Sequence, residues 1–175
     1  PGSFEELGTF ARSERAEAEA NSPGDGKIGG FGRIGGRPVA VAGDDITVKR
    51  GSSSVVGSRR VRRIFQTALQ DGHPIVNFGE TGGARIPDTL GAEGFVKVTP
   101  ELEIARRGRA VPMLSVICGE SFGGSSFQSA FSDIVIQVKG TCLAVTSPRV
   151  IEIATGEKIA FGGIARSDEH RVGKE

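Results

Sequence analysis

At 175 residues the chain is long enough to bury about 70% of its unfolded surface, so it can form a hydrophobic core without disulfides or metals. Its 22 basic and 21 acidic side chains give a net charge of +1, which provides no general attraction to nucleic acid or to an anionic membrane. No segment approaches the roughly 20 apolar residues of a membrane span, and no signal segment opens the sequence. We expect a cytoplasmic protein with one domain over residues 1–175.

The first fifty residues predict a peripheral helix and a hairpin. Ser3 and Glu6 have the spacing of a capping box, so we expect a helix and linker over residues 1–22. Strands over residues 27–34 and 37–42 then flank Gly35-Gly36, which is typical of a two-residue hairpin. Residues 46–49 predict a further strand.

A Ser-rich loop over residues 50–54 leads into a long helix. Apolar residues at positions 61, 64, 65, 68 and 69 form one helical face, which Asp71-Gly72 closes. The elements that follow are strand 74–78, a helical crossover at 90–108, strand 112–118, a helix from 124, strands 134–138 and 141–145, and a helix from Ser147-Pro148 to Thr155. This alternation favours an α/β fold.

Two of these strands carry the same pattern: a proline, an apolar run, Gly-Glu and a glycine pair. The first copy runs from Pro74 to Gly82-Gly83, and the second from Pro112 to Gly123-Gly124. Because one helical crossover fits between them, the strands can lie parallel with both glycine turns at one sheet edge. Backbone N–H groups at such an edge can bind an anionic oxygen.

Other motifs have a structural interpretation beside a functional one. Residues 30–35 match GxGxxG, but a strand follows where a nucleotide-binding motif requires a helix, which favours a glycine-rich hairpin. The arginines at 59, 60, 62 and 63 form either a solvated face or a phosphate contact. Glu80 and Glu120 either act as an acid and base or brace the two turns, and we favour bracing.

The cysteines and histidines give no sign of a metal site. Cys118 and Cys142 lie in apolar runs without CxxC spacing, so we expect buried, unpaired thiols in a reducing compartment. His73 and His170 also lack the spacing of metal ligands.

The sequence resembles a known family across most of its length. Residues 78–86, Phe-Gly-Glu-Thr-Gly-Gly-Ala-Arg-Ile, resemble the Ser/Thr-Gly-Gly-Ala-Arg segment of carboxyltransferase subunits of biotin-dependent acyl-CoA carboxylases. Residues 119–124, Gly-Glu-Ser-Phe-Gly-Gly, stand where that family has Gly-Pro-x-Ala-Gly-Gly. The similarity is collinear from Pro1 to about Gly163, and residues 164–175 form a divergent tail.

This resemblance implies a crotonase-type fold, which is a superhelix of repeated ββα units, and a particular chemistry. Carboxybiotin, held on a biotin carrier protein, yields CO2. The acyl-CoA loses its α-proton to the released biotin, and the enolate captures the CO2. The resemblance implies no metal, and it implies no side-chain base because the released biotin takes the α-proton. N–H groups near Gly83, Ala84, Gly123 and Gly124 would stabilise the enolate oxygen.

By the same resemblance, further residues would contact the acyl-CoA. They are Gly51, Ser52, Ser53, Arg59, Arg60, Gly82, Arg85 and Phe122. Family members also carry a second crotonase-like domain for the biotin side, so we expect a second subunit or domain as partner and an oligomeric assembly. Phe122 replaces the family's small alanine, which would change the shape of the acyl pocket.

Three alternatives remain open. The chain is either half of a carboxyltransferase, a subunit of a related acyl-CoA decarboxylase that runs the transfer backward, or a non-catalytic CoA-binding scaffold. An enoyl-CoA hydratase is less favoured, because the position of its catalytic carboxylate falls near Phe127, where no residue is acidic.

Overall fold

The computed structural model describes residues 2–98 and 101–159 of the chain. Within these residues, seven strands form one sheet in the order β1-β2-β3-β4-β5-β6, with β7 beside β5. The strands are β1 (Glu5–Glu6), β2 (Lys27–Ile34), β3 (Arg37–Asp44), β4 (Ile75–Thr81), β5 (Met113–Phe122), β6 (Ile134–Gln137) and β7 (Cys142–Ala144). The helices are α1 (Ala16–Glu19), α2 (Val55–Asp71), α3 (Ile86–Thr89), α4 (Gly91–Lys97), α5 (Glu101–Arg106), α6 (Gly124–Ala130) and α7 (Pro148–Thr155), with 3-10 turns η1 (Pro23–Gly26) and η2 (Lys49–Gly51).

The sheet confirms the predicted α/β architecture. β2 and β3 form the expected hairpin, in which Gly35 and Gly36 have φ angles of 58° and 79°. These left-handed values are the ones that a two-residue turn between twisted strands requires. Strands β3, β4, β5 and β6 are parallel neighbours. The C-terminal ends of β4 and β5 therefore lie at the same edge of the sheet.

Strand β5 pairs with two successive strands along its length. Its first half pairs with β6, whereas residues Glu120–Phe122 pair with β7. The pairing of β4 with β5 shifts register between Gly79 and Thr81, which marks a bulge next to the glycine turns. The successions β2-β3-α2 and β6-β7-α7 follow the expected ββα pattern, and β4, β5 and α6 form a third unit in which α3, α4 and α5 lie between the two strands.

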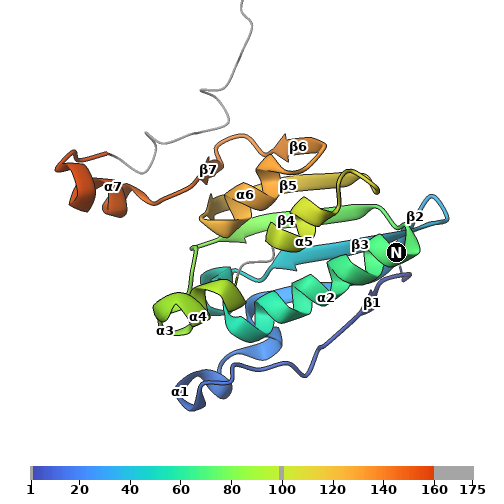
Figure 1. Cartoon of the computed structure of the whole chain (residues 1–175), viewed down its shortest axis with the longest axis horizontal. Coiled ribbons are helices and arrows are strands. Elements are labelled where there is room, and N and C mark those ends of the chain that lie inside the picture. The colour runs from blue at the N-terminus through green and yellow to red at the C-terminus, as the bar shows by residue number, and fades with distance from the viewer. Residues whose placement is uncertain (1, 99–100, 160–175) are drawn as a thin grey trace, which may run out of the picture.

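Helices α2, α5 and α6 lie against one face of the sheet (Figure 1). Ser54 caps α2 by accepting a hydrogen bond from the Gly57 N–H, and Gly72 ends the helix in a left-handed conformation. The predicted apolar face of α2 is confirmed. Its buried members pack with the inward residues of β3, β4 and β5, and this core consists of Ala40, Ala42, Val61, Ile64, Phe65, Ala68, Ile75, Ile104, Val111 and Met113. The core fixes α2 and the loop before it against the edge that carries the glycine turns.

The predicted N-terminal helix over residues 1–20 is wrong. The segment is largely extended, with β1 paired to β2 and only the four-residue helix α1. Ser3 does not cap a helix: its hydroxyl accepts a hydrogen bond from the Arg33 N–H at 3.1 Å. Glu6 instead pairs with the buried Arg60 at 2.7 Å. Tertiary contacts of this kind override the helix propensity of an Ala- and Glu-rich segment.

The predicted strand over residues 46–49 is also wrong. The Asp45 carboxylate accepts hydrogen bonds from the N–H and the hydroxyl of Thr47, which folds the segment into a turn. Lys49 and Arg50 then have positive φ angles of 49° and 56° and open η2. The remaining predicted elements are present, although β4 and β5 run three to four residues further than expected and include both Gly-Glu pairs.

The two cysteines differ in exposure. Cys142 is buried as predicted, whereas Cys118 is exposed on β5, and neither forms a disulfide. Partial burial and the charge of Glu80 raise the pKa of the Cys118 thiol above its ordinary value of 9.0. At neutral pH this thiol is therefore protonated and a poor nucleophile.

An ion pair between the buried Arg107 and the exposed Asp133 joins the segment after α5 to the segment after α6. Arg107 donates to Asp133 at 2.7 Å, and the Met113 N–H donates to the same carboxylate oxygen at 2.8 Å. These hydrogen bonds, with the Arg107 bond as the larger cause, lower the pKa of Asp133 below its ordinary value of 3.8.

Because the folded-state pKa is lowered, Asp133 stabilises the fold above pH 3.8, and this contribution is lost as the pH falls through the folded-state value. In Asp133→Asn we expect this dependence to vanish. The wild type should have the higher Tm at neutral pH, and the gap should close in acid. Thermal unfolding followed by circular dichroism across a pH series measures this, and a gap that is independent of pH would contradict it.

Candidate active site

The two glycine turns meet at the edge where β4 and β5 end. β4 ends at Thr81 and leads into Gly82-Gly83-Ala84, whereas β5 ends at Phe122 and leads through Gly123 into α6. A Cβ atom built on Gly123 would lie 3.8 Å from the Cα of Gly83, so a single methyl group there would already touch the backbone of the other turn. The predicted approach of the two turns is confirmed, while the roles of their N–H groups stay predictions.

Two of the four predicted N–H donors are already hydrogen-bonded within the protein, and two are not. The Gly83 N–H donates to the Thr81 hydroxyl at 3.1 Å, and the Gly123 N–H donates to the Val145 carbonyl at 3.2 Å. Within the described residues, the N–H groups of Ala84 and Gly124 have no acceptor. Gly124 is the first residue of α6, where an N–H lacks an intrahelical partner and carries the positive end of the helix dipole. Ala84 and Gly124 are therefore the donors that are free to bind a ligand.

A cavity of about 430 Å³ lies beside these two donors. Its lining comes from five parts of the chain and is mostly apolar: Ser53, Ala84, Phe95, Val98, Gly123, Gly124, Phe127 and Val145. A chamber of this kind suits a hydrocarbon chain with one polar atom aimed at the N–H groups. The sequence motifs identified only half of this lining. Phe95, Val98, Phe127 and Val145 carry no motif, and only the fold brings them together.

The predicted CoA-contacting loop runs alongside the first glycine turn. The Ser53 N–H donates to the Gly83 carbonyl at 2.8 Å, and the Gly82 N–H donates to the Arg50 carbonyl at 2.9 Å. Ser53 lines the cavity, whereas Gly51 is buried and accepts from the Thr81 hydroxyl at 2.8 Å. Gly82 contacts Arg50 and does not line the cavity.

Three other predicted ligand contacts are buried within the protein. Arg60 donates to the carbonyls of Leu7 and Lys27 and pairs with Glu6. Arg85 pairs with the fully buried Asp25 at 2.6 Å, and only 9% of its side chain is exposed. Phe122 is 5% exposed and packs near Gly83 without lining the cavity. These side chains support the site from within and do not present a surface to a ligand.

Arg59 differs from its neighbour Arg60, because 64% of its side chain is exposed and its ion-pair partner Glu14 is exposed as well. Arg60→Met should lower the free energy of unfolding by about 2–3 kcal/mol, since the carbonyls around it lose their donor and Glu6 remains partly in water. Arg59→Gln should change it by less than about 0.5 kcal/mol. Urea denaturation of both variants tests the difference. Equal effects would mean that the contacts of Arg60 contribute no stability.

The two predicted bracing carboxylates also behave differently from expectation. Glu120 pairs with Arg50 at 3.0 Å, and the Glu80 side chain lies against Gly119. Neither carboxylate accepts a hydrogen bond from a turn N–H in the described part of the chain. Both line a separate cavity of about 650 Å³, away from Ala84 and Gly124. They are therefore not positioned as an acid and base for a group bound at the glycine turns.

Residues 2–98 and 101–159 contain neither a metal-binding cluster nor a membrane-spanning helix. No group of three or more His, Cys, Asp and Glu side chains is arranged to hold a metal ion. No helix there is long and apolar enough to cross a bilayer.

Comparison with known proteins agrees with this geometry. The chain is 33% identical over 175 residues to the methylmalonyl-CoA carboxyltransferase 12S subunit of Propionibacterium freudenreichii, covering 97% of this chain and 33% of that protein. It is 34% identical over 182 residues to the propionyl-CoA carboxylase beta chain of Saccharopolyspora erythraea, covering 98% and 32%. A crystal structure of transcarboxylase 12S with methylmalonyl-coenzyme A superposes with a TM-score of 0.82 at 30% identity, covering 97% of this chain and 34% of that one.

The fold is therefore the α/β crotonase type, with two facing glycine turns beside an apolar cavity. Residues 1–166 match the carboxyl transferase domain, and the chain belongs to that family. It spans about a third of the length of the curated relatives that it matches.

Proposed function

We propose that this chain is the acyl-CoA-binding part of a carboxyltransferase, which moves a carboxyl group between carboxybiotin and an acyl-CoA. One observation carries the proposal: Ala84 and Gly124, whose N–H groups have no acceptor within the described residues, line the same mostly apolar cavity. A thioester needs this combination, because its acyl chain is apolar and its carbonyl oxygen becomes anionic when the α-proton leaves. Both donors belong to backbone that is already fixed, so they need no reorganisation during the reaction.

The residues of this chain act on the thioester alone. Ala84 and Gly124 would donate to the carbonyl oxygen and stabilise the enolate. Phe95, Phe127 and Val145 would hold the acyl chain and exclude water from the carbanion carbon. Removal of one such donor typically lowers kcat by about 10²–10³-fold. Because no side-chain base lines the cavity within residues 2–98 and 101–159, we assign the proton acceptor to another group.

Carboxybiotin, when bound, supplies the carboxyl group. We assign it to a biotin carrier protein and to a second crotonase-like subunit or domain, because the described residues build only the thioester side. The nature of the family supports this assignment, since the relatives include biotin-dependent carboxylase subunits and a transcarboxylase described as a hexamer assembly. An oligomer of such halves is the assembly that we propose.

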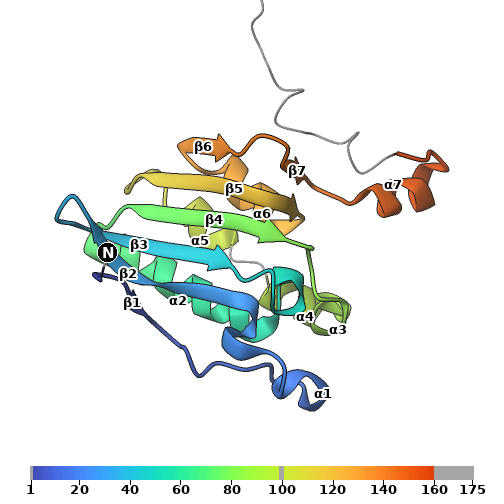
Figure 2. The same cartoon turned by 180° about the vertical axis from the view of Figure 1, so that it is seen from behind.

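An uncovered sheet face is available for this second half. Figure 2 shows the face that the described helices leave open. Two in-register rows of side chains cross β3 to β6 there. The first row is apolar throughout: Val41, Val76, Leu114 and Ile134. The second row begins with a glycine and continues with apolar side chains: Gly43, Phe78, Val116 and Ile136. They alternate with the core residues along each strand and therefore point away from α2. Phe78, Ile134 and Ile136 are 40–54% exposed.

The decarboxylase and scaffold alternatives differ from this proposal in testable ways. A scaffold has no need for unpaired N–H donors at an acyl-sized cavity, so the geometry favours an enzyme. A decarboxylase would use the same donors and is distinguished by the direction of transfer. The direct test is isotope exchange of the carboxyl group between a carboxylated acyl-CoA and free biotin, catalysed by the chain together with a second carboxyltransferase half. A complete absence of exchange in both directions would overturn the proposal.

A further inference from the structure

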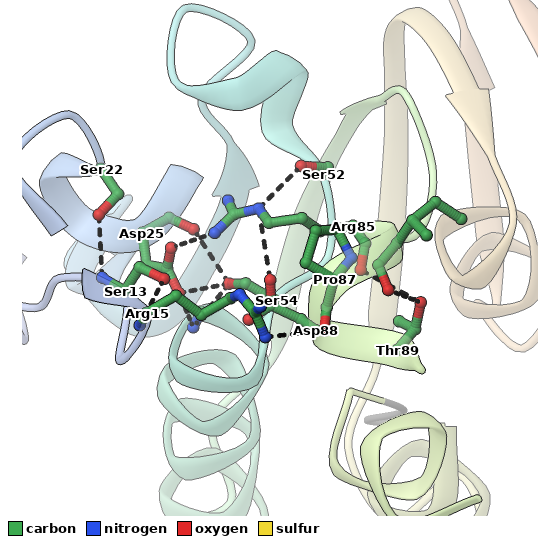
Figure 3. Close-up of polar contacts among 12 residues, drawn as sticks. Ser13, Arg15, Ser22, Asp25, Ser52, Ser54, Arg85, Pro87, Asp88 and Thr89 are labelled. Atoms are coloured by element: carbon green, nitrogen blue, oxygen red, sulfur yellow. Dashed lines mark hydrogen bonds and ion pairs between the residues drawn. The ribbon is translucent and has the colours of Figure 1, made fainter. Parts of the chain in front are cut away.

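A fully buried carboxylate lies behind the first glycine turn. Asp25 has no exposed surface and a left-handed φ of 51°. Arg85 donates to its Oδ1 at 2.6 Å, while the Ser54 hydroxyl and the Gly57 N–H donate to its Oδ2, the latter at 3.2 Å (Figure 3). A buried charge persists when it is paired and hydrogen-bonded, and both oxygens of Asp25 meet this requirement. The carboxylate thus connects Arg85 to the N-terminus of α2.

Arg85 reaches two parts of the site at once. Its Nε donates to the Ser52 hydroxyl at 3.2 Å (Figure 3). Its backbone N–H donates to the Ser53 carbonyl at 2.8 Å. It directly follows Ala84, which lines the cavity. Asp25 and Arg85 lie 60 positions apart in the sequence, and their ion pair joins the backbone of the glycine turn to the loop before α2.

That loop, residues 50–54, has a backbone that needs external support. Lys49, Arg50 and Gly51 have successive positive φ angles of 49°, 56° and 60°. Residues other than glycine disfavour positive φ angles, and a strained backbone of this kind persists only where the surrounding structure fixes it. Arg85 on Ser52 and Asp25 on Ser54 supply two of the fixing contacts. Lys27 supplies a third through the Gly51 carbonyl at 2.8 Å.

The loop and the turn behave as one hydrogen-bonded unit. Thr81 donates its hydroxyl to the Gly51 carbonyl, and the same hydroxyl accepts from the Gly83 N–H. Ser53 and Ala84 form a parallel bridge. A displacement of the loop therefore moves the backbone of the turn and the direction of the Ala84 N–H.

We infer that Asp25 and Arg85 are positioning residues that lock loop 50–54 onto the glycine turn. The family resemblance implies that this loop contacts the CoA, and a contact there with the CoA nucleotide would then fix the Ala84 N–H for catalysis. This inference rests on the proposed function. Binding energy from a remote part of a substrate accelerates a reaction when it orients groups at the reacting centre. The shared hydrogen bonds give that energy a direct path from the nucleotide to the oxyanion donor. The nucleotide would then raise kcat and not only tighten binding.

The test compares two thioesters in the chain assembled with a second carboxyltransferase half. One is an acyl-CoA, and the other is the matching acyl-pantetheine, which lacks the nucleotide. In the wild type, kcat should be higher for acyl-CoA. In Asp25→Asn, kcat for acyl-CoA should fall by about 10²-fold, the cost of a small misplacement of a catalytic group, while kcat for acyl-pantetheine changes far less. The ratio of the two kcat values should approach one.

Two further variants separate positioning from folding. Asp133→Asn makes the same change to a carboxylate paired with the buried Arg107, far from loop 50–54, and it should preserve the ratio. Thr81→Val keeps the Asp25 pair but removes the hydroxyl between loop and turn, and it should lower the ratio in a chain that still folds. Circular dichroism checks the fold of each variant.

The outcomes distinguish this inference from the proposed function. No exchange by the wild-type assembly would overturn both. Exchange by the wild type with equal kcat for the two thioesters would overturn the inference alone. Equal fractional losses for both thioesters in Asp25→Asn and Thr81→Val would also overturn it, because a purely structural role affects both substrates alike.

Discussion

Replacement of Gly124 by leucine is expected to lower kcat for carboxyl transfer by about 10²-fold or more while leaving the fold intact. Gly124 lines the cavity next to Ala84, and its N–H is one of the two free donors. A leucine side chain there would occupy the volume of the acyl group and hold the thioester oxygen away from both donors. It would not enter the core, because Gly124 belongs to the cavity wall and not to the cluster between α2 and the sheet.

The matched control is Ala130→Leu, at the other end of the same helix. Ala130 is exposed and does not line the cavity, so this variant should keep both stability and transfer. Initial rates at saturating acyl-CoA and Tm values for the two variants measure the contrast. Unchanged turnover in Gly124→Leu would mean that the thioester oxygen binds elsewhere.

The geometry of the glycine turns could be predicted from sequence because it depends on local pattern and simple topology. Two apolar runs that are bounded by the same proline and glycine residues and separated by a crossover specify parallel strands. Parallel strands bring their C-terminal ends to one edge of the sheet. The meeting of Gly83 and Gly123 follows from these rules. The apolar face of α2 was equally predictable, because its period is that of a helix.

The parts that could not be predicted depend on contacts between distant segments. Nothing in the sequence near Arg60 indicates that its guanidinium binds carbonyls of the N-terminal segment, so a basic cluster was indistinguishable from a phosphate site. Likewise, Arg85 belongs to a motif that suggests a ligand contact, but its partner Asp25 lies in a turn 60 residues earlier. The helix predicted over residues 1–20 failed for the same reason, since pairing of β1 with β2 outweighs local propensity.

The extent of the domain and the roles of the individual site residues stay predictions. The divergent tail over residues 164–175 lies outside the described residues. For the site, the geometry narrows four candidate donors to two, because hydrogen bonds within the protein already use the N–H groups of Gly83 and Gly123. Sequence could identify the turns but not this distinction, which depends on where the Thr81 hydroxyl and the Val145 carbonyl lie.

The chain alone is expected to bind acyl-CoA but to transfer no carboxyl group, and addition of a second crotonase-like half should restore transfer. The described residues place donors only around the thioester, and one reactant cannot be carboxylated until the other is held in attacking geometry. Such a positioning effect accounts for about 7–11 kcal/mol of a reaction barrier. The chain alone should therefore show almost no carboxyl transfer compared with the chain plus the second half. Calorimetry with acyl-CoA and carboxyl exchange, each measured with and without the second half, test the two parts of this prediction.

The second half should dock on the open sheet face in Figure 2. Obligate partners commonly bury more than about 2,000 Å² and have largely apolar interfaces, as this face is. Phe78→Glu should therefore prevent both assembly and transfer while acyl-CoA still binds, since Phe78 does not line the acyl cavity. Phe10→Glu is the control, because Phe10 is 95% exposed and lies outside the two apolar rows. Full transfer by a monodisperse monomer would contradict this prediction and would place the biotin side within this chain.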